Sequence, residues 1–217
     1  MIAPPAPPSP RLRGRLHQLA FIAAIPAGAV VIFGAHPAAA RTAAIVYACA
    51  LAGLYGISSS YHRLARSPRA RYWMQRLDHS MIYLFIAASY TPFGLVVLHG
   101  PWAITLLVAV WAGALCGVLL SMLRLDKSAK LGFAMYLILG WALVVAAPGM
   151  VSGLSLTDLV LVILGGVVYT IGAIILATKW PDPSPATFGY HEVWHTLVVA
   201  ATGLQYVAIR SVLAAAH

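Results

Sequence analysis

Seven apolar stretches, each about 20 residues long, follow one another along the chain and constrain its fold more than any other feature. An α-helix rises about 1.5 Å per residue, so about 20 apolar residues can cross the hydrocarbon core of a bilayer. The stretches lie at roughly 16–34, 42–62, 77–98, 102–123, 131–151, 156–178 and 190–214. This pattern predicts an all-α, polytopic membrane protein with seven transmembrane helices.

The composition agrees with a membrane protein and argues against nucleic acid as a partner. Only 9% of the residues are charged, whereas a soluble domain carries about 25%. The net charge of +9 is high, but the basic residues lie in the connections between apolar stretches, where the positive-inside rule accounts for them. We therefore expect a protein that is integral to the membrane and binds no nucleic acid.

The distribution of lysine and arginine predicts the orientation in the membrane. With seven spans, 12 of the 14 basic residues fall on the side of the amino terminus, at positions 11, 13, 15, 63, 66, 69, 71, 76, 124, 127, 130 and 179. Loops rich in Lys and Arg stay in the cytoplasm, so we expect a cytoplasmic amino terminus and a carboxyl terminus outside. Residues 1–15, with prolines between 3 and 10, are expected to form a disordered cytoplasmic tail before a seven-helix transmembrane domain at 16–217.

The amino terminus also resembles a signal peptide, because arginines and an apolar stretch precede Ala38-Ala39-Ala40. The stretch is longer than the usual signal-peptide core of about 7–15 residues. We therefore favour a first helix that is retained.

Two Ser-Pro pairs predict where helices begin. A serine N-cap followed by proline at the first helical position is a common helix start. Ser67-Pro68 and Ser184-Pro185 are accordingly expected to start the third and the seventh helix.

The unusual polar residues of the apolar stretches gather at one membrane face. The second stretch ends in Ser58 and His62, the third begins with Asp78, and the last begins with His191 and His195. Because successive spans alternate in direction, all three of these ends lie on the cytoplasmic side. Ionisable groups at membrane depth are costly and usually mark function, so we predict one site built from these distant stretches.

Three histidines in this set predict a metal site. His191 and His195 are four residues apart and therefore lie on one face of a helix. With His62 they offer three nitrogen ligands to Zn²⁺, and an open fourth position is typical of catalytic zinc. Asp78 is the expected general base. Ser58, one turn before His62, is expected to orient an imidazole or to donate a hydrogen bond to an oxyanion.

Each of these residues also has a simpler explanation. A lone buried histidine is commonly a hydrogen-bonded packing residue, Asp78 has Arg63 or Arg76 as an alternative partner, and a serine often bonds a backbone carbonyl. His79 lies about 100° around the helix from Asp78 and is expected to be structural. No role is assigned to the histidines at segment ends or in loops, which are His17, His36, His99 and His217.

The segment from His191 to His195 also matches the H-E-x-x-H pattern, in which the glutamate is the general base of a metalloprotease. A membrane protease of this type takes a further aspartate ligand from a later segment, and no aspartate follows His195. We therefore disfavour a protease and keep Glu192 as a second candidate base beside Asp78.

Taken together, these residues resemble a known family. Seven spans, with Ser58-x-x-Tyr61-His62 ending the second, Asp78 opening the third and the His191 and His195 pair opening the last, are similar to the haemolysin III family. Its members are bacterial relatives of the adiponectin and progestin receptors and are related to the alkaline ceramidases. The resemblance implies zinc on the three histidines, with Asp78 and Ser58 around the metal's water, in a multi-pass protein of the bacterial plasma membrane.

The resemblance leaves three functions open. The first is a zinc-dependent hydrolase of a lipid amide or ester, acting like a ceramidase at the cytoplasmic face on a membrane lipid. The second is a non-enzymatic receptor-like or membrane-homeostasis protein with structural zinc. The third is a cytolytic, pore-forming factor. The sequence does not fix the substrate or the oligomeric state.

Overall fold

The computed structural model describes residues 10–123 and 129–216. Within these residues the regular elements are all helices, and β pairing is confined to one isolated bridge between Ser184 and Phe188. Seven of the helical spans in this part of the chain are long and apolar enough to cross a membrane. The first four spans are α1 (Arg15–Gly34), α2 (Ala38–Leu64), α3 (Pro68–Pro92) with the π-helical turn η1 (Phe93–Val97), and α4 (Pro101–Leu123). The fifth span is broken and consists of α5 (Ala129–Gly140), the 3₁₀ turn η2 (Ala142–Ala146) and α6 (Ala147–Gly153). The last two spans are α7 (Leu156–Thr178) and α8 (Tyr190–Ala215). The predicted all-α class with seven spans is confirmed.

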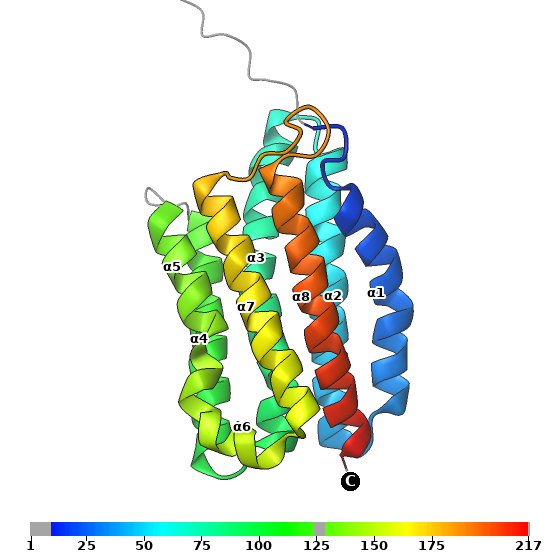
Figure 1. Ribbon diagram of the computed structural model, residues 1–217, viewed down its shortest axis with the longest axis vertical. Helices are drawn as coiled ribbons and strands as arrows, with labels where there is room; N and C mark the ends of the chain where they lie inside the picture. The colour runs from blue at the N-terminus through cyan, green and yellow to red at the C-terminus, as the bar shows by residue number, and fades with distance from the viewer. Residues whose placement is uncertain (1–9, 124–128, 217) are drawn as a thin grey trace, which may run out of the picture.

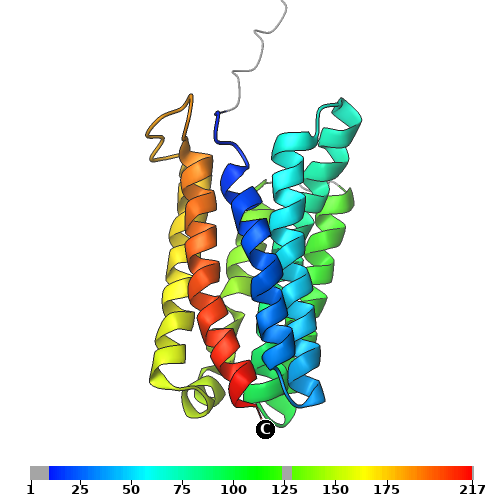
Figure 2. The ribbon, with the colours of Figure 1, turned by 90° about the vertical axis from the view of Figure 1, so that its right-hand side faces the viewer.

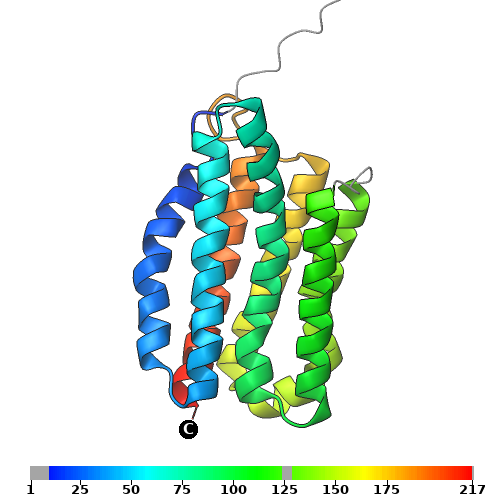
Figure 3. The same cartoon turned by 180° about the vertical axis from the view of Figure 1, so that it is seen from behind.

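The spans form a ring in chain order. Each of α1 to α4 packs against the next helix, α7 packs against α8, and α8 returns to α1. The ring closes where α5 and α6 of the fifth span pack over a small area against α7. Figure 1 shows the helices side by side along the long axis. Figure 2 shows α1 between α8 and α2, and Figure 3 shows α3 between α2 and α4.

The two ends of the described chain lie at opposite ends of this bundle (Figure 1). We call the end at which α1 begins the amino-terminal end of the bundle. There, the backbone N–H groups of Arg11 and Leu12 donate to the carbonyls of Ala186 and Thr187, both at 3.1 Å. These bonds join residues 11–12 to the segment before α8, and residues 1–9 of the expected disordered tail lie outside the described residues.

One of the two predicted helix starts is confirmed and the other is wrong. The Ser67 hydroxyl accepts a hydrogen bond from the backbone N–H of Ala70 at 3.1 Å and caps α3. Ser184, in contrast, exchanges two backbone hydrogen bonds with Phe188, at 3.0 and 2.7 Å. This pairing closes a turn, so helix α8 begins only at Tyr190 and His191 lies in its first turn.

Glycines on α4 allow its neighbours to approach closely. A Cβ atom built on Gly117 would lie 2.4 Å from the Tyr83 ring on α3. One built on Gly113 would lie 2.5 Å from a methyl group of Leu139 on α5. Both distances are far inside van der Waals contact. The Leu139 methyl group could shift away from a side chain at position 113, but the buried Tyr83 ring leaves no room for one at position 117.

A tyrosine of α3 holds the break in the fifth span. The Tyr90 hydroxyl donates to the carbonyls of Leu139 and Gly140, at 2.9 and 2.7 Å, and accepts from the backbone N–H of Leu143 at 3.2 Å. These are backbone groups at the change from α5 to η2, which lack regular helical partners. The hydroxyl therefore satisfies them inside the bundle.

Candidate metal centre

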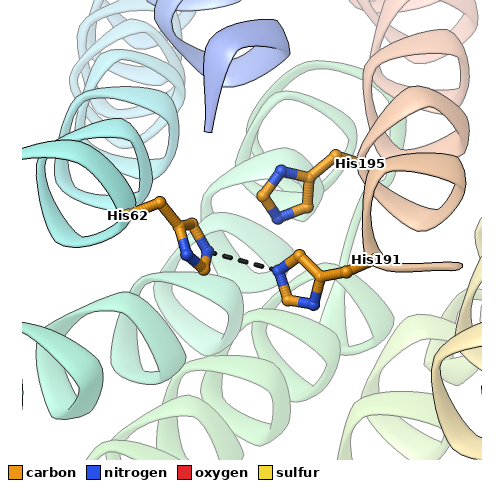
Figure 4. A group of neighbouring side chains, drawn as sticks. All are labelled: His62, His191 and His195. Carbon is orange, nitrogen blue, oxygen red and sulfur yellow. Dashed lines mark hydrogen bonds between the residues drawn. The ribbon is translucent and has the colours of Figure 1, made fainter. Parts of the chain in front are cut away.

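The structure brings the three predicted histidines together at the amino-terminal end of the bundle. His62 comes from the last turn of α2, and His191 and His195 from the start of α8. Figure 4 shows their imidazoles facing one another. One nitrogen of each ring lies within 4.8 Å of those of the other two. Helix α8 places its pair on one face because the two residues are one turn apart.

The distances and the unpaired nitrogens fit a metal ion. Nε2 of His62 and Nε2 of His191 are 3.2 Å apart, and Zn–N bonds of about 2.0–2.1 Å at tetrahedral angles separate two ligand nitrogens by about 3.3 Å. An N–H···N hydrogen bond has a similar length, so His195 is more informative. It is 1% exposed, and its Nε2 has no hydrogen-bond partner among the described residues. A buried unpaired nitrogen costs about 1–3 kcal/mol, and a metal ion would satisfy it.

Asp78 and Ser58 lie beside the histidines, as the sequence predicts. Oδ2 of Asp78 on α3 is 4.0 Å from Nε2 of His62, and Asp78 is 7% exposed. Ser58 is buried on α2, one turn before His62. Both side chains line the same cavity. They are therefore positioned to act on a group bound there.

Neither arginine suggested as a partner of Asp78 takes that role. In the described part of the chain, no arginine nitrogen lies within 4.0 Å of an Asp78 oxygen. The Arg76 guanidinium instead donates from Nε to the carbonyl of Met122 at 3.0 Å and stacks on the Tyr72 ring at 3.6 Å. The Asp78 carboxyl therefore remains directed toward the histidine cluster.

Glu192 is engaged elsewhere. Its Oε1 accepts a hydrogen bond from Nε of Arg13, and its Oε2 accepts from the backbone N–H of Gly189 at 2.9 Å. Residues one apart on a helix differ by about 100° in direction, so Glu192 does not share the face of His191. This carboxylate caps α8 and anchors the segment before α1, which favours Asp78 as the candidate base.

His17, which is assigned no role from the sequence, contacts the histidine cluster and Ser58. It lies on the first turn of α1, is 2% exposed, and its Nδ1 is 2.9 Å from Oγ of Ser58. Its ring stacks on that of His195 with the centroids 3.7 Å apart and the planes 5° from parallel. A signal was present in the sequence: α1 begins on the same side as the other polar residues, so the argument that grouped them applies to His17 as well.

An apolar cavity of about 430 Å³ leads away from the cluster. Its polar end is lined by His17, Ser58 and Asp78. It continues past apolar side chains of α3, α5, α6 and α7, among them Ile82, Phe85, Phe93, Leu137, Met150 and Val162. Asp78 on α3 and Phe93 at the start of η1 both line it and are 15 residues apart, so the cavity extends about 22 Å along this span.

Comparisons with known proteins show the family of this chain. A model of the Haemolysin-III related family matches residues 7–206. Hemolysin-3 from Bacillus cereus is 32% identical over 197 residues, which cover 89% of this chain and 86% of that protein. The Hemolysin-3 homolog of Bacillus subtilis (strain 168) is 29% identical over 196 residues, 89% of either chain. Monocyte to macrophage differentiation factor from Homo sapiens is 27% identical over 175 residues, 78% of this chain and 69% of that protein. With seven spans and a family match over most of its length, this chain belongs to the Haemolysin-III related family.

Proposed function

We propose that this protein is an integral-membrane, zinc-dependent hydrolase that cleaves an amide or ester bond of a membrane lipid, as a ceramidase does. The observation that carries the proposal is the cavity, which begins at Ser58 and Asp78 beside the three histidines and continues between apolar side chains. Such a cavity suits a hydrocarbon chain, because most of a ligand site is apolar and a few polar groups fix the reacting end. The lipid's carbonyl would then lie next to the histidines.

The roles follow from the donor set and the positions of its neighbours. His62, His191 and His195 would hold the zinc ion. When bound, zinc supplies Lewis-acid polarisation and makes water more acidic. Asp78, 4.0 Å from His62, would accept the proton of the attacking water and pass it to the leaving amine or alcohol. The Ser58 hydroxyl would donate a hydrogen bond to the carbonyl oxygen as its negative charge develops.

The basic residues supply the expected orientation. Counted along the sequence with seven spans, 12 of the 14 lysines and arginines fall on the side of the amino terminus, and the positive-inside rule assigns that side to the cytoplasm. With that orientation, the site would act on the inner leaflet. The membrane would be a bacterial plasma membrane, because two of the relatives are Bacillus proteins.

One observation favours a second candidate, a non-enzymatic protein with structural zinc. The three histidines would tie α2 to α8, and zinc at that position would stabilise the bundle. Structural zinc sites usually have four protein ligands, however, whereas three leave a position for catalysis. Among the described residues the cluster has three histidines, so we favour the hydrolase. The apolar lining of the cavity likewise gives no support to a water-filled pore.

Metal content tests the site. We expect stoichiometric zinc in the purified protein and its loss in His195→Ala, with His99→Ala as the matched control because His99 is exposed in the loop after η1. A chelator should lower the unfolding temperature of the unmutated protein and of the control but not that of His195→Ala, because a ligand that binds the native state stabilises it. An unmutated protein that binds no zinc would contradict the proposal.

Lipid turnover separates the two candidates. Zinc-loaded protein in lipid nanodiscs would be incubated with a ceramide and with a diacyl lipid, and release of fatty acid would be measured by mass spectrometry. Asp78→Asn keeps the shape of the side chain and is expected to retain zinc while losing turnover. If zinc-loaded protein releases no fatty acid from either lipid, the structural-zinc candidate replaces the hydrolase.

A further inference from the structure

His17 is a histidine in contact with the candidate metal centre that does not belong to the three-histidine cluster. It is the one polar side chain among the buried residues of α1, beside Ala24, Gly28 and Val31. Burying an imidazole is costly unless other groups interact with it. Its Nδ1 bonds to Ser58, one of its faces covers His195, and it makes an edge-to-face contact with the Tyr55 ring, with the centroids 5.1 Å apart.

The geometry argues against His17 as a fourth ligand. The lone pair of an imidazole nitrogen lies in the plane of the ring. The rings of His17 and His195 are 5° from parallel and 3.7 Å apart, so an ion about 2.0–2.1 Å from a nitrogen of one ring cannot lie in the plane of the other. The Nδ1 atom of His17 pairs with the Ser58 hydroxyl at 2.9 Å. Its Nε2 has no hydrogen-bond partner among the described residues, but it lies in the His17 ring plane, which is parallel to that of His195. His17 therefore lies beside the cluster without joining it.

His17 restrains two neighbouring groups, the ring of His195 and the hydroxyl of Ser58. Rotation of the His195 ring about its last side-chain bond would drive the ring into His17, so the stack fixes the plane in which Nε2 of His195 points. The hydrogen bond between Nδ1 of His17 and the Ser58 hydroxyl fixes the position of the Ser58 oxygen at the polar end of the cavity. Groups that orient ligands in this way commonly change metal affinity about 10–100-fold when they are removed.

We propose that His17 is a positioning residue of this centre: its stacked ring sets the orientation of His195, and its Nδ1 sets the position of the Ser58 hydroxyl. The inference rests on the proposed zinc site. It adds a contribution from α1, a helix that supplies none of the three candidate ligands. The two contacts use different parts of the ring, so substitutions can remove them separately.

Three variants separate the contacts. His17→Phe keeps a stacked ring and loses the hydrogen bond, His17→Asn keeps a polar group near the position of Nδ1 and loses the stack, and His17→Ala loses both. Gln18→Ala is the matched control, because Gln18 is the next residue and its side-chain amide bonds Arg15 at 3.2 Å. Zinc affinity would be measured by competition with a chelator. The visible absorption of Co²⁺ loaded in place of zinc reports ligand geometry without any turnover.

We expect His17→Ala and His17→Asn to bind zinc about 10–100-fold more weakly than the unmutated protein and to alter the cobalt spectrum. His17→Phe should retain both the affinity and the spectrum while losing lipid turnover through Ser58. If His17→Ala does not fold, the other two variants still distinguish the contacts. Zinc affinity and cobalt spectra in His17→Asn equal to those of the control would overturn the inference and leave the proposed function intact. Absence of metal from the unmutated protein would overturn both.

Discussion

Replacing Glu192 with alanine is expected to weaken the start of α8 rather than remove a catalytic base. The buried carboxylate accepts hydrogen bonds from Arg13 and from the backbone N–H of Gly189. Loss of a helix cap costs about 1 kcal/mol, and loss of a charge-assisted hydrogen bond costs about 1.5–3 kcal/mol. The Arg13 side chain is 23% exposed and can turn to water, so the lower part of that range applies. The free energy of unfolding should fall by about 2–3 kcal/mol.

Thermal unfolding in detergent, followed by tryptophan fluorescence, measures this effect. Glu192→Gln should cost less than alanine, about 1 kcal/mol, because the amide oxygen still accepts from one partner. Arg13→Ala removes the other side of the ion pair and serves as the matched variant. The double variant with Glu192→Ala should be less destabilised than the sum of the two single changes, because both remove one shared interaction.

The same variants distinguish the two candidate bases. In Glu192→Gln we expect zinc to be retained and lipid turnover to persist, whereas Asp78→Asn should keep zinc and lose turnover. A Glu192→Gln protein with the unfolding temperature and zinc content of the unmutated chain, but with no turnover, would refute this reasoning. It would assign the proton transfer to Glu192 and revive the metalloprotease interpretation of His191 to His195.

Two further predictions concern packing away from the metal centre. Gly117→Ala should destabilise the protein by about 1–3 kcal/mol, because the new methyl group would lie 2.4 Å from the buried Tyr83 ring. The unfolding temperature measures this effect. An unchanged unfolding temperature would contradict the close approach of α3 and α4. Tyr90→Phe should cost about 1–3 kcal/mol by leaving backbone groups at the break in the fifth span unpaired, of which the carbonyl of Leu139 is buried. Faster hydrogen exchange at the backbone N–H of Leu143 would reveal that loss, and exchange equal to that of the unmutated protein would contradict it.

The seven spans and the main residues of the site were predictable from simple physics. Long apolar stretches have few alternatives to membrane-spanning helices, and alternation of direction places the end of one span beside the start of the next. This reasoning was sufficient to group His62, Asp78 and the His191 and His195 pair, although more than 100 residues separate the first from the last. It required no knowledge of side-chain packing.

The errors arose where packing or competing hydrogen bonds decide the outcome. Ser184 has the sequence pattern of an N-cap, but its backbone groups pair with Phe188 and so close a turn. His17 has no partner at helical spacing, and its role depends on how far α1 is rotated against α2 and α8. The bond between Arg13 and Glu192 joins residues 179 positions apart. Neither spacing nor hydropathy contains that information.

Helix α1 therefore contributes more to the site than its lack of candidate ligands suggests. The three histidines belong to α2 and α8, and α1 packs against both of these helices (Figure 2). Arg13, just before α1, bonds Glu192 on α8, and His17 contacts Ser58 on α2 and His195 on α8. The spacing of the two helices that carry the three histidines thus depends on a third helix. A substitution that shifts α1 should change the arrangement of the three histidines without altering any of them.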